Sequence, residues 1–420
     1  MGIQFDFDTA VGVGRADGIL MDIARRAQVP QSKHEEAIEH YQGLAQHVDR
    51  EGSPLQDKVI ENYPSGSFSI HAATYSRVKD GQHDVDVVME VDVQPGTDPE
   101  WMLDTLFDAV KGEPGSKYND YKVDRNTRCV TVTYPDGVTV DLMPVVRIPG
   151  GPERSAHLHH HKPETGEKAL KEVNPKAFTN HFNANIGTSD TFAAKFRSRR
   201  LLVEGLLEKA ETQPLPDHLP IEEKSPRLIA IQLFKRFRDV QYRPKSRSRL
   251  RKPPSVVIAA LALDAGPMTD SLTTELKAIA RRFSEAITEA EESGRTLEIR
   301  NPAHPADVFT DRWPEDRASQ RLWQNDLEDF VHKLELLEQD EFDPERVKKE
   351  LTKMFGETLA NHAIEEHFRG QSEIAKKNQL GMSGLGQMKP AVAATVASAS
   401  VIVPAHASTN MGGALDDVDY

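Results

Sequence analysis

An alternating run from Asp84 to Val93 constrains the fold more than any other feature of the sequence. Apolar side chains hold every second position: Val85, Val87, Met89, Val91 and Val93. The positions between them are Asp84, Asp86, Val88, Glu90 and Asp92. Successive residues of a strand point to opposite faces of a sheet. The pattern therefore predicts a strand with one face in a core and Asp84 and Asp86 side by side on the other.

A hairpin predicted further along the chain carries a third carboxylate. Two β-rich runs, Arg128–Tyr134 and Val138–Val145, flank Pro135-Asp136-Gly137, in which proline presets φ and glycine takes a positive φ. Asp141 shares a face of the second run with Thr139 and Met143. An acid in such an apolar strand is unusual in a core and natural for a metal ligand at a sheet surface.

The remaining patterns predict an α+β chain that turns helical. We expect helical structure over 16–50 with a cap at Ser32, a short helix over Gln56–Asn62 and a helix over Pro99–Lys111. Later expected helices are Thr191–Ala210, Pro226–Tyr242, Ser255–Ala265, Thr273–Ser293, Ser319–Glu338 and Pro344–Arg369. We therefore divide the chain into a catalytic lobe with N-terminal helices over 1–188, a helical lobe over 189–375 and a disordered tail over 376–420.

Composition narrows the class of protein. The 420 residues carry a net charge of −14, and binding a polyanion needs a basic surface, so phosphate chemistry must sit in a local pocket. The single cysteine, Cys129, excludes an intrachain disulfide and a four-cysteine zinc site, which fits a reducing cytoplasm. The first residues lack a signal-peptide pattern, and the apolar run Ala391–Val403 is too short to span a bilayer. We expect a cytoplasmic protein without a membrane partner.

The three aspartates suit divalent cations. Two neighbouring carboxylates repel unless a cation lies between them, and ligand sets made only of oxygen favour Mg²⁺. A lone Asp-x-Asp is usually a solvated strand face. Asp141 downstream and a glycine-serine turn upstream, in this order, favour the functional interpretation, in which metal ions activate an attacking hydroxyl and stabilise a leaving pyrophosphate.

Further phosphate-binding candidates surround the aspartates in sequence. Gly66-Ser67 stands 17 residues before Asp84, and such a turn can bring backbone N–H groups and a hydroxyl to phosphate oxygens. Lys235 lies on a predicted helix beside its apolar face, where it could reach a triphosphate. From Lys235 to Lys252 the chain has nine basic residues and one acid, Asp239. We predict that the later part of this segment is a mobile loop that attracts phosphate.

A histidine cluster, His157 and His159 to His161, has zinc-binding chemistry. Consecutive histidines on a strand point to opposite faces and cannot all converge on one ion. We therefore favour a structural role for the His157–His161 cluster.

Taken together, Gly66-Ser67, Asp84-Val-Asp86 and Val140-Asp141-Leu-Met-Pro resemble the signature of the DNA polymerase β-like nucleotidyltransferases. Further segments are similar to the bacterial cGAS/DncV-like nucleotidyltransferases (CD-NTases) of CBASS anti-phage systems. They are Asn174-Pro-Lys176, Phe234–Asp239, Pro254-Ser255-Val-Val and Asn301–Trp313. The resemblance implies a polymerase β-like core, a mixed sheet with helices, and a helical lobe that closes the other wall of the active-site cleft.

The resemblance also implies roles for individual residues. Asp84, Asp86 and Asp141 would bind two Mg²⁺ ions, with Mn²⁺ as a substitute. Gly66 and Ser67 would hold the donor triphosphate with Lys235 and Ser255. The substrates would be nucleoside triphosphates, ATP, GTP or others, and the product a cyclic di- or oligonucleotide second messenger for anti-phage signalling. CBASS accessory proteins are candidate partners. Sensing of double-stranded DNA is not implied, because the chain lacks the zinc ribbon of animal cyclic GMP–AMP synthase.

Two alternatives stay open. A template-independent RNA-tailing enzyme could use the same core, although it would need a long basic track that an acidic chain does not offer. A non-catalytic scaffold of the same fold is the other alternative. It would have no reason to keep three carboxylates together.

Overall fold

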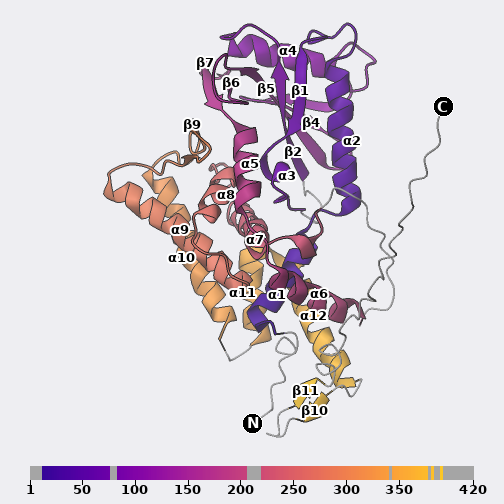
Figure 1. Ribbon diagram of the computed structural model, residues 1–420, viewed down its shortest axis with the longest axis vertical. Helices are drawn as coiled ribbons and strands as arrows, with labels where there is room; N and C mark the ends of the chain where they lie inside the picture. Colours follow the sequence, from indigo (N-terminus) through magenta and orange to yellow (C-terminus); the bar gives the residue numbers. More distant parts are fainter. Residues whose placement is uncertain are drawn as a thin grey trace, which may run out of the picture.

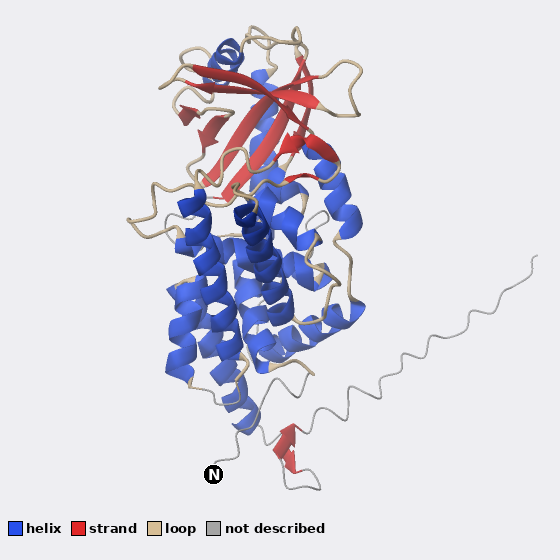
Figure 2. Cartoon of the chain, turned by 90° about the vertical axis from the view of Figure 1, so that its left-hand side faces the viewer, coloured by secondary structure: helices blue, strands red, loops and turns tan. Residues whose placement is uncertain are grey.

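The computed structural model describes residues 12–75, 83–205, 219–339, 343–376, 380–382 and 388–390. Two lobes lie along the long axis of the molecule, with the sheet in one and a bundle of helices in the other (Figure 1). The view turned by 90° shows the same division, with helices packed side by side below the sheet (Figure 2). The helical expectation over Thr191–Ala210 is met by α6, Asp190–Gly205; the predicted continuation past residue 205 lies outside the described residues.

The sheet confirms the predicted strand and hairpin. Its path runs β1-β2-β5-β4-β3, and β6 joins the end of β5 and pairs with β7. The strands are β1 Val59–Pro64, β2 His83–Val91, β3 Lys122–Arg125, β4 Val130–Thr133, β5 Val138–Arg147, β6 Ala156–Lys162 and β7 Glu167–Val173. The central pair, β2 and β5, is parallel, whereas its neighbours pair antiparallel. The predicted alternation therefore lies in the middle of the sheet.

Two helices, α2 (Gln31–Val48) and α4 (Pro99–Lys111), pack on the apolar face of the sheet and enclose a core with β2 and β5. The bounds of α4 match the prediction because its ends carry strong signals. Asp98 accepts hydrogen bonds from the N–H groups of Glu100 and Trp101, and Gly112 follows the last residue with φ +63°.

The second lobe is built on a separate apolar core, rich in aromatic rings such as those of Phe237 and Phe330, which stack at 4.1 Å between centroids. Its helices are α5 Pro175–Asn185, α6, α7 Pro226–Gln241, α8 Ser255–Leu263, α9 Leu272–Glu292, α10 Arg317–Leu337, α11 Pro344–Phe355 and α12 Glu357–Lys376. The N-terminal helix α1, Arg15–Ala27, packs in the same core against α7, α9 and α12. Short strands β8 (Arg300–Asn301) and β9 (His304–Val308) project from this lobe toward the sheet (Figure 1).

Three helix predictions differ from the structure. The short helix over Gln56–Asn62 is wrong, because Val59–Pro64 forms β1 and pairs with β2. Helical structure over 16–50 is interrupted after Ala27, and α2 begins at Gln31 because Pro30 has no N–H to continue a helix, so Ser32 lies inside α2 rather than at its cap. The helix predicted over Pro344–Arg369 is broken at Gly356, whose φ is +90°.

The predicted tail falls mostly outside the described residues. Within 376–420 the structure describes the last residue of α12 and two short strands, β10 (Leu380–Met382) and β11 (Met388–Pro390), which pair antiparallel.

Candidate active site

The parallel pairing of β2 and β5 brings the predicted aspartates together. Asp86 lies directly beside Asp141 in the register, and Asp84 lies beside Thr139. Asp84 is exposed, whereas Asp86 and Asp141 are half-buried. Since alternate residues share a face, all three carboxylates emerge on the side of the sheet opposite the α2–α4 core. Residues 57 positions apart in the chain thus form one acidic surface.

The negative charges of these carboxylates repel one another. Burial raises the pKa of Asp86 to about 7, and the charges of Asp141 and Asp84 push it in the same direction. Burial also raises the pKa of Asp141, against a hydrogen bond from the Thr131 hydroxyl. The Thr139 hydroxyl donates in the same way to Asp84. A compensating positive charge at this place would relieve the repulsion.

The donor chemistry of the aspartates fits a divalent cation such as Mg²⁺. Among the described residues, however, no three His, Cys, Asp or Glu side chains are arranged as a preformed metal site. Asp84 and Asp141 each give one oxygen to a threonine hydroxyl in this arrangement. The other oxygen of each carboxylate accepts no hydrogen bond from these threonines, so a cation could bind there while Thr139 and Thr131 hold the two side chains in place. Neither threonine was singled out from the sequence, because a threonine in a strand is commonplace.

Gly66 lies against the central aspartate. It begins the short helix α3, Gly66–Ser69, with φ +58°, and the N–H of Ser65 donates to the carbonyl oxygen of Asp86 at 2.8 Å. A Cβ atom on Gly66 would lie 2.0 Å from Oδ2 of Asp86. Only glycine therefore permits both the backbone angle and the contact with the carboxylate. Ser67 follows, half-buried, beside the aspartates.

Gly66→Ala should lower the turnover of this site on the order of 100-fold, because the new methyl group must displace Asp86, and a misplacement of about 1 Å costs that much. The control is Gly150→Ala, at φ +74° with open space around it, so that it carries the backbone strain alone. Steady-state turnover and thermal melting of both variants are the measurements. Equal losses in the two variants would mean that backbone strain, and not the contact with Asp86, explains the effect.

Lys235 is buried on α7 and faces the same region from the helical lobe. Its Nζ donates to the carbonyl oxygen of Ala72 at 2.8 Å. Burial lowers its pKa to about 7; the Arg238 charge also lowers it, while Asp239 and Asp86 raise it. The lysine predicted to lie beside the apolar face is therefore deeper than expected, with little negative charge to stabilise its ammonium form.

Arg238 organises the wall next to Lys235. Its guanidinium donates to the carbonyl oxygen of Pro253 at 2.8 Å and to the hydroxyl of Ser255 at 3.0 Å. It also pairs with Asp239, which Lys252 contacts at 2.7 Å. Ser255 is the first residue of α8 and is half-buried. The sequence marked Arg238 only as part of a basic run, and nothing in that run distinguished it from its neighbours.

One cavity of about 560 Å³ gathers every predicted site residue. The residues from the sheet side are Gly66, Ser67, Asp84, Asp86 and Asp141, and those from the helical lobe are Lys235 and Ser255. The cavity lies between the two lobes, as the resemblance implies.

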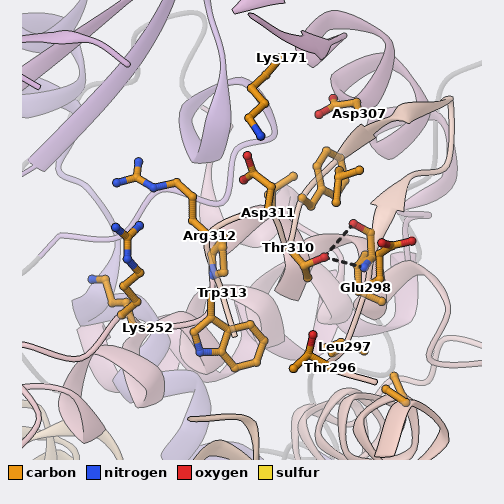
Figure 3. Close-up of a pocket in the computed structure, with 18 of the residues that line it drawn as sticks. Lys171, Lys252, Thr296, Leu297, Glu298, Asp307, Thr310, Asp311, Arg312 and Trp313 are labelled. Carbon is orange, nitrogen blue, oxygen red and sulfur yellow. Dashed lines mark hydrogen bonds between the residues drawn. The ribbon is translucent and has the colours of Figure 1, made fainter. Parts of the chain in front are cut away.

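A larger cavity of about 1730 Å³ adjoins the first (Figure 3). The two share wall residues, among them Asp239, Lys252, Asp307 and Phe309. The larger cavity extends between the sheet and α9, with Lys171 and Asp307 on one side and Trp313 on the other in Figure 3. The smaller cavity, which the aspartates line, therefore adjoins a larger space along the shared wall.

Buried hydrogen bonds join the two lobes at the wall that the two cavities share. The N–H of Asn174 donates to Oδ2 of Asp307 at 3.1 Å, and Nδ2 of Asn301 donates to the same oxygen at 3.1 Å. Asn301 Nδ2 also contacts the carbonyl oxygen of Asn174. Two of the segments that carried the family resemblance, at Asn174 and at Asn301–Trp313, thus meet in space. Sequence reasoning missed Asp307 and Phe309, although both lie within the second segment.

The basic segment after α7 forms ion pairs with other parts of the chain. Residues 243–254 form no helix or strand, as predicted, and three of their basic side chains form ion pairs. Arg247 pairs with Asp326 at 2.6 Å, Arg251 with Glu315 at 2.9 Å, and Lys252 with Asp239. These charges are therefore partly neutralised by their partners, and Lys252 alone of this set reaches the smaller cavity.

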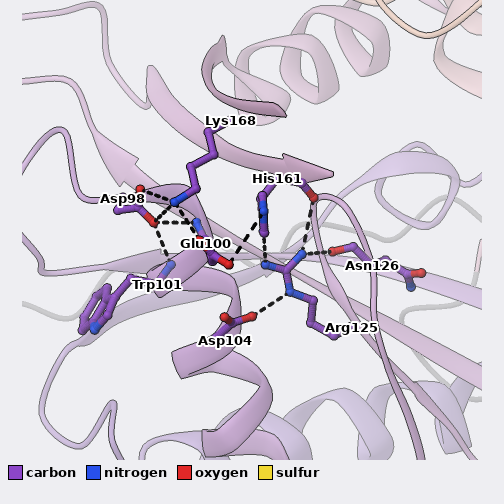
Figure 4. Close-up of polar contacts among 8 residues, drawn as sticks. All are labelled: Asp98, Glu100, Trp101, Asp104, Arg125, Asn126, His161 and Lys168. Atoms are coloured by element: carbon purple, nitrogen blue, oxygen red, sulfur yellow. Dashed lines mark hydrogen bonds and ion pairs between the residues drawn. The ribbon is translucent and has the colours of Figure 1, made fainter. Parts of the chain in front are cut away.

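The histidine cluster lies on β6, where His159, His160 and His161 are buried. Arg125 donates to His161 at 2.7 Å and pairs with Asp104 at 2.9 Å, while Lys168 bridges Asp98 and Glu100 nearby (Figure 4). Arg128 donates to His160 at 3.1 Å and pairs with Asp311 of the helical lobe. These side chains thus link β6 to α4 and to the second lobe.

No helix within the described residues is long and apolar enough to cross a membrane.

Comparisons with known proteins agree with the geometry. The profile of the Second Messenger Oligonucleotide or Dinucleotide Synthetase domain matches residues 19–185. The chain is 31% identical over 402 residues, 94% of each chain, to the cyclic dinucleotide synthase CdnG of Bradyrhizobium diazoefficiens. The structure of that CD-NTase with GTP superposes with a TM-score of 0.70 at 30% identity and covers 84% of this chain and 98% of the other. A complex of Escherichia coli CdnC with HORMA-deltaN shares the fold, at TM-score 0.52 and 17% identity over 82% of this chain and 97% of the other.

Proposed function

Because this chain belongs to the bacterial cGAS/DncV-like nucleotidyltransferases, whose relative CdnG is a cyclic dinucleotide synthase, we propose that it makes a cyclic nucleotide messenger from nucleoside triphosphates, with GTP among its substrates. The observation that carries the proposal is the adjacency of Asp86 and Asp141 in one cavity with Gly66, Ser67 and Lys235. A scaffold would have no use for neighbouring carboxylates whose charges raise the pKa of the central one, Asp86. This is the argument against the non-catalytic alternative.

The reaction is a phosphoryl transfer in which a ribose hydroxyl attacks the α-phosphate of a triphosphate. A bond forms between the ribose oxygen and phosphorus, the bond to the β-phosphate breaks, pyrophosphate leaves, and the hydroxyl proton passes to solvent or a neighbouring carboxylate. Bound at Asp84, Asp86 and Asp141, Mg²⁺ would lower the pKa of the hydroxyl and neutralise the leaving group. A second transfer between the same two nucleotides closes the ring.

The protein residues bind and orient the triphosphate. Ser67 offers a hydroxyl beside the aspartates, and Lys235 offers an ammonium group from the facing helix. Because Lys235 is buried, its charge is gained most readily when an anion arrives, so binding a triphosphate should raise its pKa again. Ser255 and Arg238 lie on the same wall and extend this polar surface. Positioning and charge neutralisation supply the catalysis.

Incubation of the purified protein with the four nucleoside triphosphates and Mg²⁺, followed by mass spectrometry, tests the proposal. We expect a cyclic product and released pyrophosphate without any primer, no product after chelation of divalent ions, and recovery with Mg²⁺ or Mn²⁺. Extension of an added RNA in place of cyclisation would establish the RNA-tailing alternative. Absence of any product under all these conditions would favour the scaffold.

The messenger would serve anti-phage signalling in the cytoplasm, where nucleoside triphosphates are abundant, together with CBASS accessory proteins. The support for this role is the family resemblance. Cells carrying the chain with its neighbouring genes should survive phage better than cells in which Asp84 and Asp86 are replaced by asparagine. Equal plaque numbers in the two strains would count against a defence role while leaving the synthase activity intact.

A further inference from the structure

Asp307 is a fixed carboxylate in the wall between the two cavities. It lies on β9, is only 6% exposed, and lines both spaces. Its Oδ2 atom accepts from the backbone of Asn174 and from Asn301 Nδ2, each at 3.1 Å. Within the part of the chain that the structure describes, no donor reaches Oδ1, and this oxygen is not among the buried polar atoms without a partner, so it keeps some exposure. The carboxylate of Asp307 points into the cavity in Figure 3. Two donors therefore hold the side chain in one orientation and leave one acceptor for a ligand.

An aromatic ring accompanies this acceptor. Phe309 lies two residues beyond Asp307, directly after the end of β9, and lines both cavities. Its N–H donates to the carbonyl oxygen of Ile299 at 2.8 Å, and its ring packs edge-on against Phe178 at 5.0 Å between centroids. A half-buried ring held in this way offers a surface on which a nucleobase can stack.

A carboxylate oxygen beside an aromatic ring distinguishes the bases by their hydrogen-bonding edges. Guanine presents two neighbouring donors, N1–H and N2–H, to an acceptor-only group, whereas adenine presents the acceptor N1 in the corresponding place. We propose that Asp307 is a specificity-determining residue that reads the Watson–Crick edge of a guanine stacked against Phe309. This inference rests on the proposed function and names the base that one of its substrate positions takes.

The surroundings of Asp307 make the effect of one substitution directional. In Asp307→Asn, the amide oxygen should take the place of Oδ2, because the N–H of Asn174 and Nδ2 of Asn301 both donate to that position. An NH₂ group placed there would face two other donors. The amide NH₂ group then faces the cavity as a donor. The cavity-facing atom changes from an acceptor to a donor, which suits adenine N1 and repels guanine N1–H. The substitution preserves the size of the side chain and keeps the two hydrogen bonds that join the lobes.

The experiment compares initial rates of product formation from GTP, ITP and ATP, and product composition from an equimolar mixture, for the wild type and Asp307→Asn at mildly alkaline pH. ITP keeps N1–H but lacks the 2-amino group. We expect the wild type to prefer GTP over ITP and ITP over ATP, and Asp307→Asn to lose about tenfold or more of its preference for GTP over ATP, with more adenine in the product. Asp108→Asn is the control, because Asp108 is an exposed aspartate on α4 that lines neither cavity.

The outcomes separate the two proposals. If the wild type makes no product from any triphosphate, the proposed function fails. If the wild type is active and Asp307→Asn lowers the rates with all three triphosphates equally, the inference is overturned. Asp307 would then contact the ribose or would only join the two lobes through its hydrogen bonds. The inference is also overturned if the wild type uses ITP, GTP and ATP equally well, a result that does not depend on the folding of any variant. A change of base preference in Asp108→Asn as large as that in Asp307→Asn would likewise overturn the inference.

Discussion

Replacing Asp84 and Asp86 together with asparagine should lower turnover on the order of 10³-fold or more, because both the cation site and its charge on the reacting phosphate are lost. The fold should survive, since the double variant removes like charges from a crowded surface. Asp92→Asn is the matched control: Asp92 is an exposed aspartate directly after the same strand. Pyrophosphate release and thermal melting are the measurements. Wild-type turnover by the double variant with unchanged melting would remove these residues from the mechanism.

The double variant should also differ from the wild type in how the melting temperature of the metal-free protein depends on pH. The pKa of Asp86 rises from its ordinary value of 3.8 to about 7 in the fold, so its neutral form is the one that the fold favours. Its contribution to stability is therefore complete below pH 3.8 and is lost as the pH rises through about 7. The metal-free wild type should lose melting temperature across this window, and the double variant should lose less. Added Mg²⁺ should stabilise the wild type selectively.

Lys235→Met should lower turnover on the order of 100-fold at every ionic strength, because a fixed charge in a closed cleft is worth about 2–4 kcal/mol to the transition state. Methionine keeps the apolar stem and removes the ammonium group, although the Ala72 carbonyl oxygen loses its donor. That loss should cost about 1–3 kcal/mol of stability, which urea unfolding measures separately from activity.

The matched control for Lys235→Met is Arg249→Ala, in the exposed part of the same basic segment. Its effect should be small, should appear mainly in KM, and should fade as salt rises, because exposed charges act through screened attraction. The comparison is a titration with triphosphate at low and high salt. A large, salt-independent loss of turnover in Arg249→Ala, with a mild effect of Lys235→Met, would move the phosphate-binding charge to the loop.

Local patterns predicted the elements that position the aspartates. The alternation around Asp84 and Asp86 and the Pro-Asp-Gly turn both act over a few residues, so their structure could be read from neighbouring positions. The same holds for α4, whose cap and glycine stop are adjacent to it. Val59–Pro64 was mistaken for part of a helix because its strand form depends on pairing with β2, a partner more than twenty residues away in the chain.

Site residues could be predicted where the residue type itself suggests a chemical role. They could not be predicted where the role depends on contacts that only the folded chain makes. Three aspartates, a glycine-serine turn and a lysine beside an apolar helix face could be singled out, and the structure brings them to one cavity. Thr131, Thr139 and Asp307 could not, since their importance comes from partners on other strands or on the other lobe. The burial of Lys235 was likewise invisible, because helix periodicity places a residue on a face but not at a depth.

The contact between Gly66 and Asp86 has a consequence for how such chains diverge. The carboxylate oxygen occupies the volume where any side chain at position 66 would begin. The two positions are therefore epistatic: alanine at 66 is tolerated only after the residue at 86 has become smaller or has moved. A side chain at position 66 would therefore act on the chemistry through the carboxylate that it displaces. Substitutions at the two positions should have effects on turnover that do not add, because each of them disturbs the same contact.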